Sequence, residues 1–174
     1  MALREGATSP ENRKSAVAVL AGGCFWGMED LLRKVPGVLE TEVGYAGGNL
    51  VHPTYEQVCT GRTGHAESVR VVFDPERIAY ADLVHFFFRM HDPTSLNRQS
   101  HDIGTQYRSA IFVENEEQRL IAEHVKAEVE RSGKWQRKIV TEISAAATFY
   151  AAEDYHQDYL EKHSDGYSCH YLRD

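Results

Sequence analysis

The 174-residue sequence predicts one α+β domain, a ferredoxin-like (split βαβ) two-layer sandwich with a mixed, mainly antiparallel sheet and an irregular C-terminal tail. Two observations predict this class. Strand-length apolar runs and helix-length amphipathic runs follow each other in the order strand, helix, strand, strand, helix, strand, helix, strand. The chain is 42% apolar and 26% charged, which is the composition of a globular protein with a hydrophobic core. Its length is sufficient for one such core and too short for two full-sized domains.

The first half of the chain contains three predicted strands and one helix. Residues 15–21 form a continuous apolar run that ends at Gly22 and Gly23, which is typical of a buried central strand. Pro36 stops the helix that follows, and residues 47–49, Gly-Gly-Asn, end the second strand. Strands are predicted over residues 15–21, 38–46 and 67–73, a helix over residues 24–34, and a long polar loop over residues 52–65. Long loops in compact domains often carry function.

The second half of the chain contains three predicted helices and two strands. Strands are predicted over residues 107–113 and 139–143, and helices over residues 80–91, 115–132 and 150–162. Asn115 and Gln118 have the spacing of a helix cap pair. The inward face of the helix that they begin is predicted to consist of Leu120, Ile121, Val125 and Val129. Residues 163–174 are predicted to be irregular.

Charge and composition limit the partners and the compartment. A net charge of -7 without a Lys/Arg cluster predicts neither nucleic-acid binding nor binding to an anionic membrane. No apolar stretch approaches the roughly 20 residues that span a bilayer. Residues 1–14 lack the apolar core of a signal peptide and are interpreted as a flexible tail. Three widely separated cysteines are not the framework of a secreted domain, so we expect a cytoplasmic protein and, as the simplest state, a monomer.

The most informative segment is Gly-Gly-Cys-Phe-Trp-Gly at residues 22–27, where a buried strand meets a helix. The unpaired amides and positive dipole end of a helix stabilise an anion, so the sequence predicts a lowered pKa for the Cys24 thiol. Phe25 and Trp26 are bulky and apolar at a turn, which suggests walls for a small apolar group such as a methyl. The alternative is that Cys24 is a small buried hydrophobic residue and the aromatic pair is core.

Three further side chains have positions suited to catalysis. Glu67 shares the strand face of Val69 and Val71, so partial burial is expected to raise its pKa and make it a general acid. A strand-end glutamate that reaches solvent is the alternative. Tyr55 and Tyr107 lie beside loops, where a phenol hydroxyl can point into a cleft, although most tyrosines simply pack.

Cys169 lies in an irregular segment that contains Gly166. Such a segment can move to bring one thiol to another sulfur, as disulfide exchange requires. The alternative is a free thiol without a function.

Three segments in this order resemble the signature segments of the peptide methionine sulfoxide reductase A family: GGCFWG, HPTYEQVCTGRTGHAE and DIGTQYRS. The resemblance runs from about residue 15 to residue 163. It implies a reductase that returns methionine S-sulfoxide, free or in proteins, to methionine. It further implies that residues 15–174 are a single catalytic domain, with residues 163–174 as a mobile tail.

The resemblance also implies the role of each residue. Cys24 attacks the sulfoxide sulfur and is left as a sulfenic acid, and Cys169 converts that acid to a disulfide that thioredoxin, or another dithiol, reduces. Glu67 protonates the oxygen. The remaining substrate-binding residues implied are Phe25 and Trp26 at the methyl group, Tyr55 and Tyr107 at the oxygen, and Asp102 as an ordering partner. No bound cofactor and no metal are implied.

The chain departs from some relatives because its tail carries a single cysteine, so the predicted thiol relay is short. Cys59 matches a position that the family often fills with cysteine, but its loop is not the usual resolving segment. Two other functions remain as alternatives. A thiol peroxidase also needs a reactive cysteine and a resolving partner. A non-enzymatic redox sensor or metal-binding module is opposed by the absence of a Cys-x-x-Cys spacing.

Overall fold

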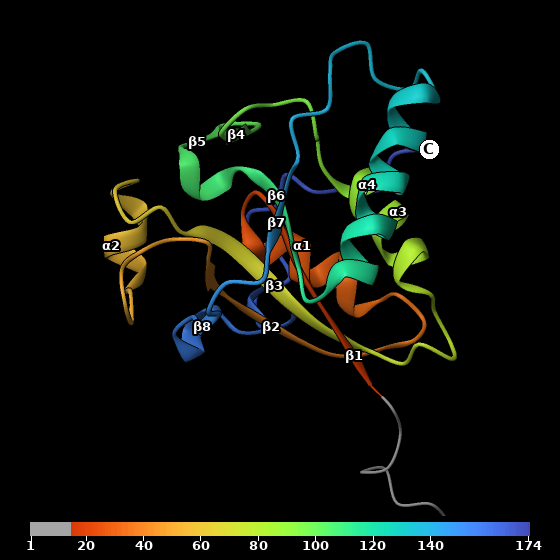
Figure 1. The fold of residues 1–174 in the computed structure, drawn as a ribbon. Coiled ribbons are helices and arrows are strands. Elements are labelled where there is room, and N and C mark those ends of the chain that lie inside the picture. The colour runs from red at the N-terminus through yellow and green to blue at the C-terminus, as the bar shows by residue number, and fades with distance from the viewer. Residues whose placement is uncertain (1–14) are drawn as a thin grey trace, which may run out of the picture.

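The computed structural model describes residues 15–174, so the predicted flexible tail of residues 1–14 lies outside the described residues. The fold is α+β, with a six-stranded mixed sheet in the order β7-β6-β1-β3-β2-β8 (Figure 1). The strands are β1 (Ala16–Gly22), β2 (Val38–Ala46), β3 (Ala66–Phe73), β6 (Ser109–Val113), β7 (Glu142–Ala145) and β8 (Tyr150–Ala151), and β4 (Arg98–Gln99) and β5 (Asp102–Ile103) form a separate hairpin. The helices are α1 (Phe25–Arg33), α2 (Tyr55–Cys59), α3 (Tyr80–Met90), α4 (Glu116–Arg131) and α5 (Tyr159–Lys162), with 3₁₀ turns η2 (Thr105–Tyr107) and η3 (Asp154–His156).

The apolar strand β1 lies in the middle of the sheet. Leu20 is opposite Val69 of β3 on one side and Ile111 of β6 on the other, and both pairings are antiparallel. Only the pairing of β6 with β7 is parallel among the strands of the described residues, so the sheet is mixed and mainly antiparallel. Because β1 is covered on both faces and both edges, its C-terminal end is a rigid platform for whatever follows it.

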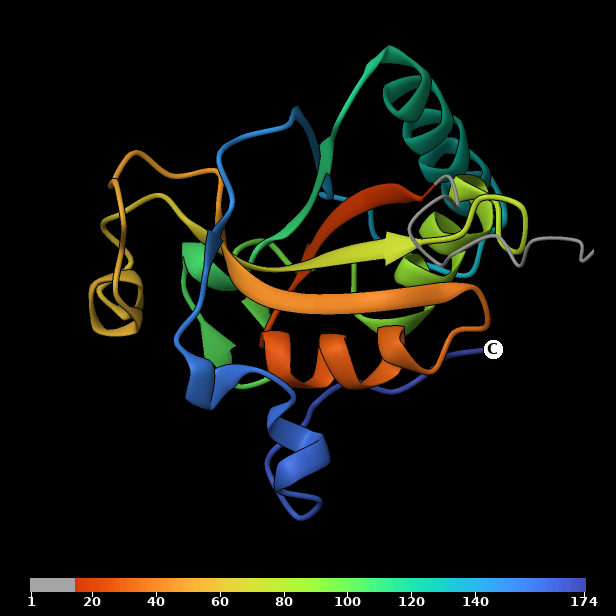
Figure 2. The same cartoon turned by 90° about the horizontal axis from the view of Figure 1, so that it is seen from below.

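Alternate residues of β1 point to two different apolar clusters. Ala18 and Leu20 join the main core, to which α1, α3 and α4 all contribute. Val19 and Ala21 join a smaller cluster on the opposite face of the sheet. Figure 2 shows α1 lying along one face of β2 and β3. The sheet therefore carries its main helices on one side, with α1 beginning directly beneath the end of β1.

Most predicted elements are present with small shifts of their ends. The strand over residues 38–46 has the predicted bounds, and Asn115 does cap α4, since its side chain accepts a hydrogen bond from the Gln118 N–H at 2.9 Å. Strand β7, which pairs with β6, begins at Glu142, three residues later than the strand predicted over residues 139–143. Leu120 is 60% exposed, so its predicted inward position is wrong, and Gln118 and Ala122 take the buried side of the helix with Val125.

Two predicted segments were wrong. The polar loop over residues 52–65 contains the short helix α2, which a capping box starts: the Thr54 side chain and the Gln57 side chain each bind the other residue's backbone N–H. The predicted helix over residues 150–162 is instead strand β8, the turn η3 and the short helix α5. Asp158 has a positive φ of 54°, which interrupts any continuous helix there.

Residues 163–174 contain no helix or strand, as predicted. Their mobility remains a prediction. None of the helices in residues 15–174 is both long and apolar enough to cross a membrane.

Candidate active site

Cys24 occupies the junction between the central strand and the first helix. It is the N-cap residue of α1 rather than a residue of its first turn. Gly23 just before it has a φ of +100°, and a side chain there would place its Cβ 2.7 Å from the Gln99 Cγ. The glycine therefore allows the chain to turn tightly from β1 into α1. The Cys24 side chain is buried, with 8% of the residue exposed.

Glu67 lies beside the start of α1. Strand β3 neighbours β1, and the Phe25 N–H donates to the Glu67 Oε1 at 3.2 Å. Only 2% of Glu67 is exposed. Its pKa is raised to about 8: burial is the largest cause, the hydrogen bond from Phe25 opposes the rise, and the charge of Asp102 adds to it. The raised pKa predicted for Glu67 is confirmed, and at neutral pH its carboxyl group carries a proton that it can donate.

The pKa of Cys24 is raised, so the prediction of a lowered pKa was wrong. Burial is the largest cause, and the negative charge of Glu67 is the second. The Trp26 N–H at the start of α1 does favour the thiolate, as expected from the helix terminus, but desolvation exceeds that effect. In the free protein at neutral pH, Cys24 is therefore a thiol, and protonation of Glu67 removes the nearest repelling charge.

Tyr55 and Tyr107 lie near Glu67 from two different elements. Tyr55 is the first residue of α2, and Tyr107 is the last residue of η2. Both are half-buried, and burial, together with the Glu67 charge, raises the pKa of each phenol. Both hydroxyl groups are thus protonated donors over the whole physiological range.

Asp102 is the first residue of β5, and its charge raises the pKa of Glu67. Burial raises the pKa of Asp102, and a hydrogen bond with Tyr167 of the tail lowers it. Its Oδ2 atom is buried and has no hydrogen-bond partner among residues 15–174. A buried acceptor without a partner is costly, so this oxygen is free to bind a donor or water that enters the site.

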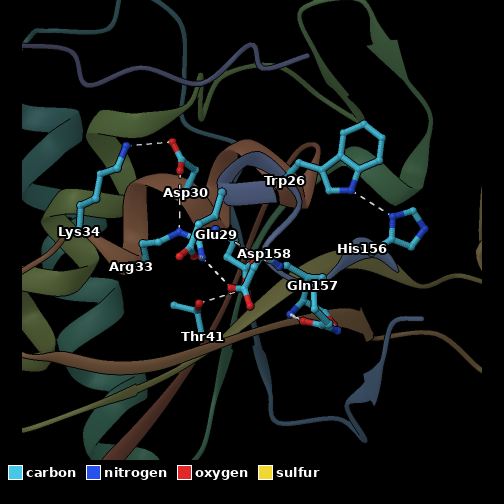
Figure 3. A network of polar contacts seen from close by, with 11 residues as sticks. Trp26, Glu29, Asp30, Arg33, Lys34, Thr41, His156, Gln157 and Asp158 are labelled. Carbon is cyan, nitrogen blue, oxygen red and sulfur yellow. Dashed lines mark hydrogen bonds and ion pairs between the residues drawn. The ribbon is translucent and has the colours of Figure 1, made fainter. Parts of the chain in front are cut away.

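Phe25 and Trp26 differ in their burial and in their contacts. Phe25 is 1% exposed and packs against Tyr45 and His156, with ring centroids 5.8 and 5.2 Å away. Trp26 is half-buried, stacks on the Tyr159 ring at 3.8 Å with an interplanar angle of 11°, and donates its indole N–H to the His156 Nδ1 at 3.0 Å (Figure 3). The indole plane is therefore fixed from two sides.

A polar cluster attaches residues 154–159, the segment whose His156 and Tyr159 contact Trp26, to helix α1 (Figure 3). Glu29 of α1 is fully buried, and its carboxylate accepts hydrogen bonds from the Asp158 N–H at 2.8 Å and the Thr41 hydroxyl at 3.0 Å. Arg33, one turn later, contacts the Asp158 carboxylate at 2.6 Å and Glu161 at 2.9 Å. We call these five residues the α1 clamp. The clamp holds Asp158 in its left-handed conformation.

Cys169 lies in the part of the tail that packs against the start of α1. It is half-buried, and its charge is among the causes that raise the pKa of Cys24. Its Sγ is 3.8 Å from the His170 Nδ1, and a hydrogen bond with Tyr167 lowers its pKa against the larger effect of burial. Cys24, Cys59 and Cys169 are all free thiols. Cys59 is exposed at the end of α2, beside Tyr55.

A family model described as peptide methionine sulfoxide reductase matches residues 16–174. The chain belongs to the peptide methionine sulfoxide reductase family. The MsrA protein of Nocardia farcinica is 55% identical over 156 residues, covering 90% of this chain and 89% of that protein. The MsrA protein of Methanothermobacter thermautotrophicus is 57% identical over 145 residues, covering 83% and 86%.

Two solved structures have this fold. Reduced Mxr1 from Saccharomyces cerevisiae superposes with a TM-score of 0.88 at 39% identity, over 98% of both chains. Mxr1 in complex with Trx2 superposes with a TM-score of 0.64 at 28% identity, over 98% of this chain and 97% of that one. The resemblance stated from the three sequence segments is confirmed.

Some residues of this reductase site were missed from sequence. His156 and Tyr159, which fix Trp26, were assigned only to a helix predicted over residues 150–162. The run Asp-Tyr-His-Gln-Asp-Tyr at 154–159, with aromatic and charged residues alternating, was the available signal. Within residues 15–174, no three His, Cys, Asp or Glu side chains are grouped so that they could hold a metal ion.

Proposed function

We propose that Cys24 is the nucleophile with which this chain reduces methionine S-sulfoxide, free or in proteins, to methionine. The single observation that carries the proposal is the buried Glu67 carboxyl, with a pKa of about 8, directly beside the first residue of the helix that Cys24 caps. A protonated acid next to a sulfur nucleophile is what reduction of an S–O bond needs, because the oxygen leaves sulfur only if it gains a proton.

In the first step, the Cys24 sulfur attacks the sulfoxide sulfur. Glu67 gives its proton to the sulfoxide oxygen, with Tyr55 and Tyr107 donating hydrogen bonds to it. The Cys24 proton goes to the Glu67 carboxylate. The hydroxyl group then passes to the Cys24 sulfur as the substrate S–O bond and the bond between the two sulfurs break, which leaves methionine and a Cys24 sulfenic acid. The methionine sulfur is reduced by two electrons and the cysteine sulfur is oxidised by two. We assign the methyl group to the side chains of Trp26 and Phe25.

In the second step, Cys169 resolves the sulfenic acid. Its sulfur attacks the Cys24 sulfur, the S–S bond forms, the S–O bond breaks, and hydroxide leaves with the Cys169 proton as water. A dithiol then reduces the disulfide. We propose thioredoxin as that dithiol, and the complex of Mxr1 with Trx2 supports this choice.

Two variants test this assignment. Cys24→Ser is expected to abolish methionine release from methionine S-sulfoxide. Cys169→Ser is expected to release about one methionine per enzyme and then stop, since its sulfenic acid cannot form the disulfide that thioredoxin reduces. Continued turnover of Cys169→Ser with thioredoxin would show that Cys169 is not the resolving residue. Cys59→Ser is the matched control and is expected to cycle like the wild type.

The same assay separates this function from a thiol peroxidase. A peroxidase needs a thiolate in the free protein, whereas burial raises the pKa of Cys24. We therefore expect methionine S-sulfoxide to be reduced far faster than hydrogen peroxide. The opposite preference would establish the peroxidase.

We also infer that the centre of the fold is a ferredoxin-like (split βαβ) unit. The support is the antiparallel order β6-β1-β3-β2, in which α1 connects β1 to β2 and α3 connects β3 to β6. The parallel strand β7 and the short edge strand β8 are additions to that unit. Residues 15–174 then form a single catalytic domain with a C-terminal segment that carries Cys169.

A further inference from the structure

We propose that His170 is a positioning residue that docks the C-terminal segment on the turn between β1 and α1, so that Cys169 stands beside Cys24 before the sulfenic acid forms. The inference rests on the proposed function, because it concerns the second step of that reaction. In this arrangement the tail is already bound at the active site of the reduced protein and does not have to reach it by diffusion.

The first contact is a hydrogen bond between positions far apart in sequence. The His170 Nε2 lies 2.7 Å from the backbone oxygen of Gly22, two residues before Cys24. A carbonyl oxygen only accepts, so Nε2 must carry the proton and donate it. Gly22 is part of β1, the central strand, so this bond ties the tail to the most rigid part of the fold.

The second contact is the fit of the imidazole ring against two glycines. A Cβ atom built at Gly27 would lie 2.5 Å from the His170 Nδ1 and 2.5 Å from the Ser168 Oγ, and a Cβ atom at Gly23 would lie 3.3 Å from the His170 Nε2. The tail therefore lies directly on the backbone of α1 and of the turn before it. The last glycine of the Gly-Gly-Cys-Phe-Trp-Gly segment is required by this contact, since any side chain at position 27 would displace the ring.

The third contact connects His170 to the thiol itself. Because Nε2 holds the proton, Nδ1 has a free lone pair, and the Cys169 Sγ is 3.8 Å from it. His170 is 9% exposed, and this burial lowers its pKa to about 4, which leaves the ring neutral at physiological pH. The imidazole thus binds β1 with one nitrogen and faces the resolving thiol with the other.

A separate pair of hydrogen bonds fixes the chain beyond His170. The Arg173 N–H donates to the Arg89 backbone oxygen at 2.8 Å, and the Arg89 Nε donates to the Arg173 backbone oxygen at 2.9 Å. The segment that carries Cys169 is thus attached to the end of α3 on one side and to β1 through His170. Holding two reactants in place before they react removes much of the entropy cost of bringing them together.

The test measures methionine release and Cys24–Cys169 disulfide formation separately in the His170→Ala variant of the full chain. Methionine release in the first turnover, without reductant, is expected to keep the wild-type rate. Formation of the Cys24–Cys169 disulfide is expected to slow by about tenfold or more, in line with the cost of misplacing a reacting group. Sulfenic acid should accumulate on Cys24 and be trapped by dimedone, a signal that a role in stability alone would not produce.

Two variants make the result interpretable. His170→Gln keeps an N–H donor near the Nε2 position and is expected to recover most of the disulfide rate. His124→Ala removes an exposed histidine on α4 and is expected to behave like the wild type. Disulfide formation at the wild-type rate in His170→Ala would overturn the positioning role. Absence of methionine release from the wild type would instead overturn the proposed function, so the two failures are distinguishable.

Discussion

The charge of Glu67 affects the protonation of Cys24, and in the proposed mechanism this coupling decides when the nucleophile is active. Burial raises the pKa of both groups, and the charge of Glu67 raises that of Cys24 further. At neutral pH the acid is protonated and the thiol is neutral. In the mechanism that we propose, the sulfoxide oxygen takes the Glu67 proton when the substrate binds, and the carboxylate that remains then accepts the Cys24 proton.

We predict that Glu67→Gln slows the sulfoxide step by roughly a hundredfold, as expected when a general acid is lost. The wild-type rate should also fall as the pH rises through about 8, because only the protonated carboxyl can donate and its pKa is about 8. Single-turnover methionine release from neutral to alkaline pH measures both effects. Glu76→Gln, at an exposed glutamate, is the control. A pH profile that is unchanged in Glu67→Gln would contradict the assignment.

We predict that Cys24 reacts slowly with iodoacetamide in the free protein. Its thiol is buried and its pKa is raised, whereas Cys59 is exposed. Peptide mass spectrometry after brief treatment at neutral pH should find Cys59 modified before Cys24. Modification of Cys24 first would mean that the helix terminus outweighs desolvation, as the sequence had suggested.

At the scale of elements, the α1 clamp fixes the segment that orients Trp26, the residue to which we assign the substrate methyl group. Glu29 and Arg33 of α1 hold Asp158, and the segment around Asp158 supplies the two rings that fix Trp26. Removing one member of a buried ion pair leaves its partner with an uncompensated buried charge, which strongly destabilises the folded protein.

We predict that Glu29→Ala lowers the free energy of unfolding by about 3 kcal/mol, because the Asp158 N–H and the Thr41 hydroxyl lose a buried acceptor and Arg33 loses an ion-pair partner at 3.6 Å. The KM for methionine sulfoxide should rise as well, since Trp26 loses its fixed orientation. Urea denaturation and steady-state kinetics measure the two effects. Asp30→Ala removes a partly exposed ion pair with Lys34 and is expected to change the unfolding free energy by less than about 1 kcal/mol.

The elements that sequence predicted correctly are those with strong periodicity. Strand β2 and helix α4 were predicted almost to the residue, because apolar spacing and a cap residue define them. The helix predicted over residues 150–162 was wrong. The aromatic and charged residues of this segment have helical spacing, but they contact α1 and β2 instead of each other. Tertiary contacts of this kind leave no periodic signal in a single sequence.

At the scale of the whole molecule, the site is assembled from segments far apart in the chain. Cys24 follows β1, Glu67 is on β3, Tyr107 ends η2, and Cys169 is in the tail. The candidate residues could be named from the three sequence segments and the tail. The sign of the Cys24 pKa shift and the docking of His170 could not, because both depend on packing between the tail, β1 and α1.

The burial of Cys24 has a further consequence for an enzyme whose substrate, methionine sulfoxide, is itself a product of oxidation. Peroxide attacks thiolates far more readily than thiols, and repeated attack leads to sulfinic and sulfonic acids that cannot be restored by simple dithiols. A nucleophile kept neutral and covered until a damaged methionine arrives is therefore spared by the same oxidants whose damage it reverses.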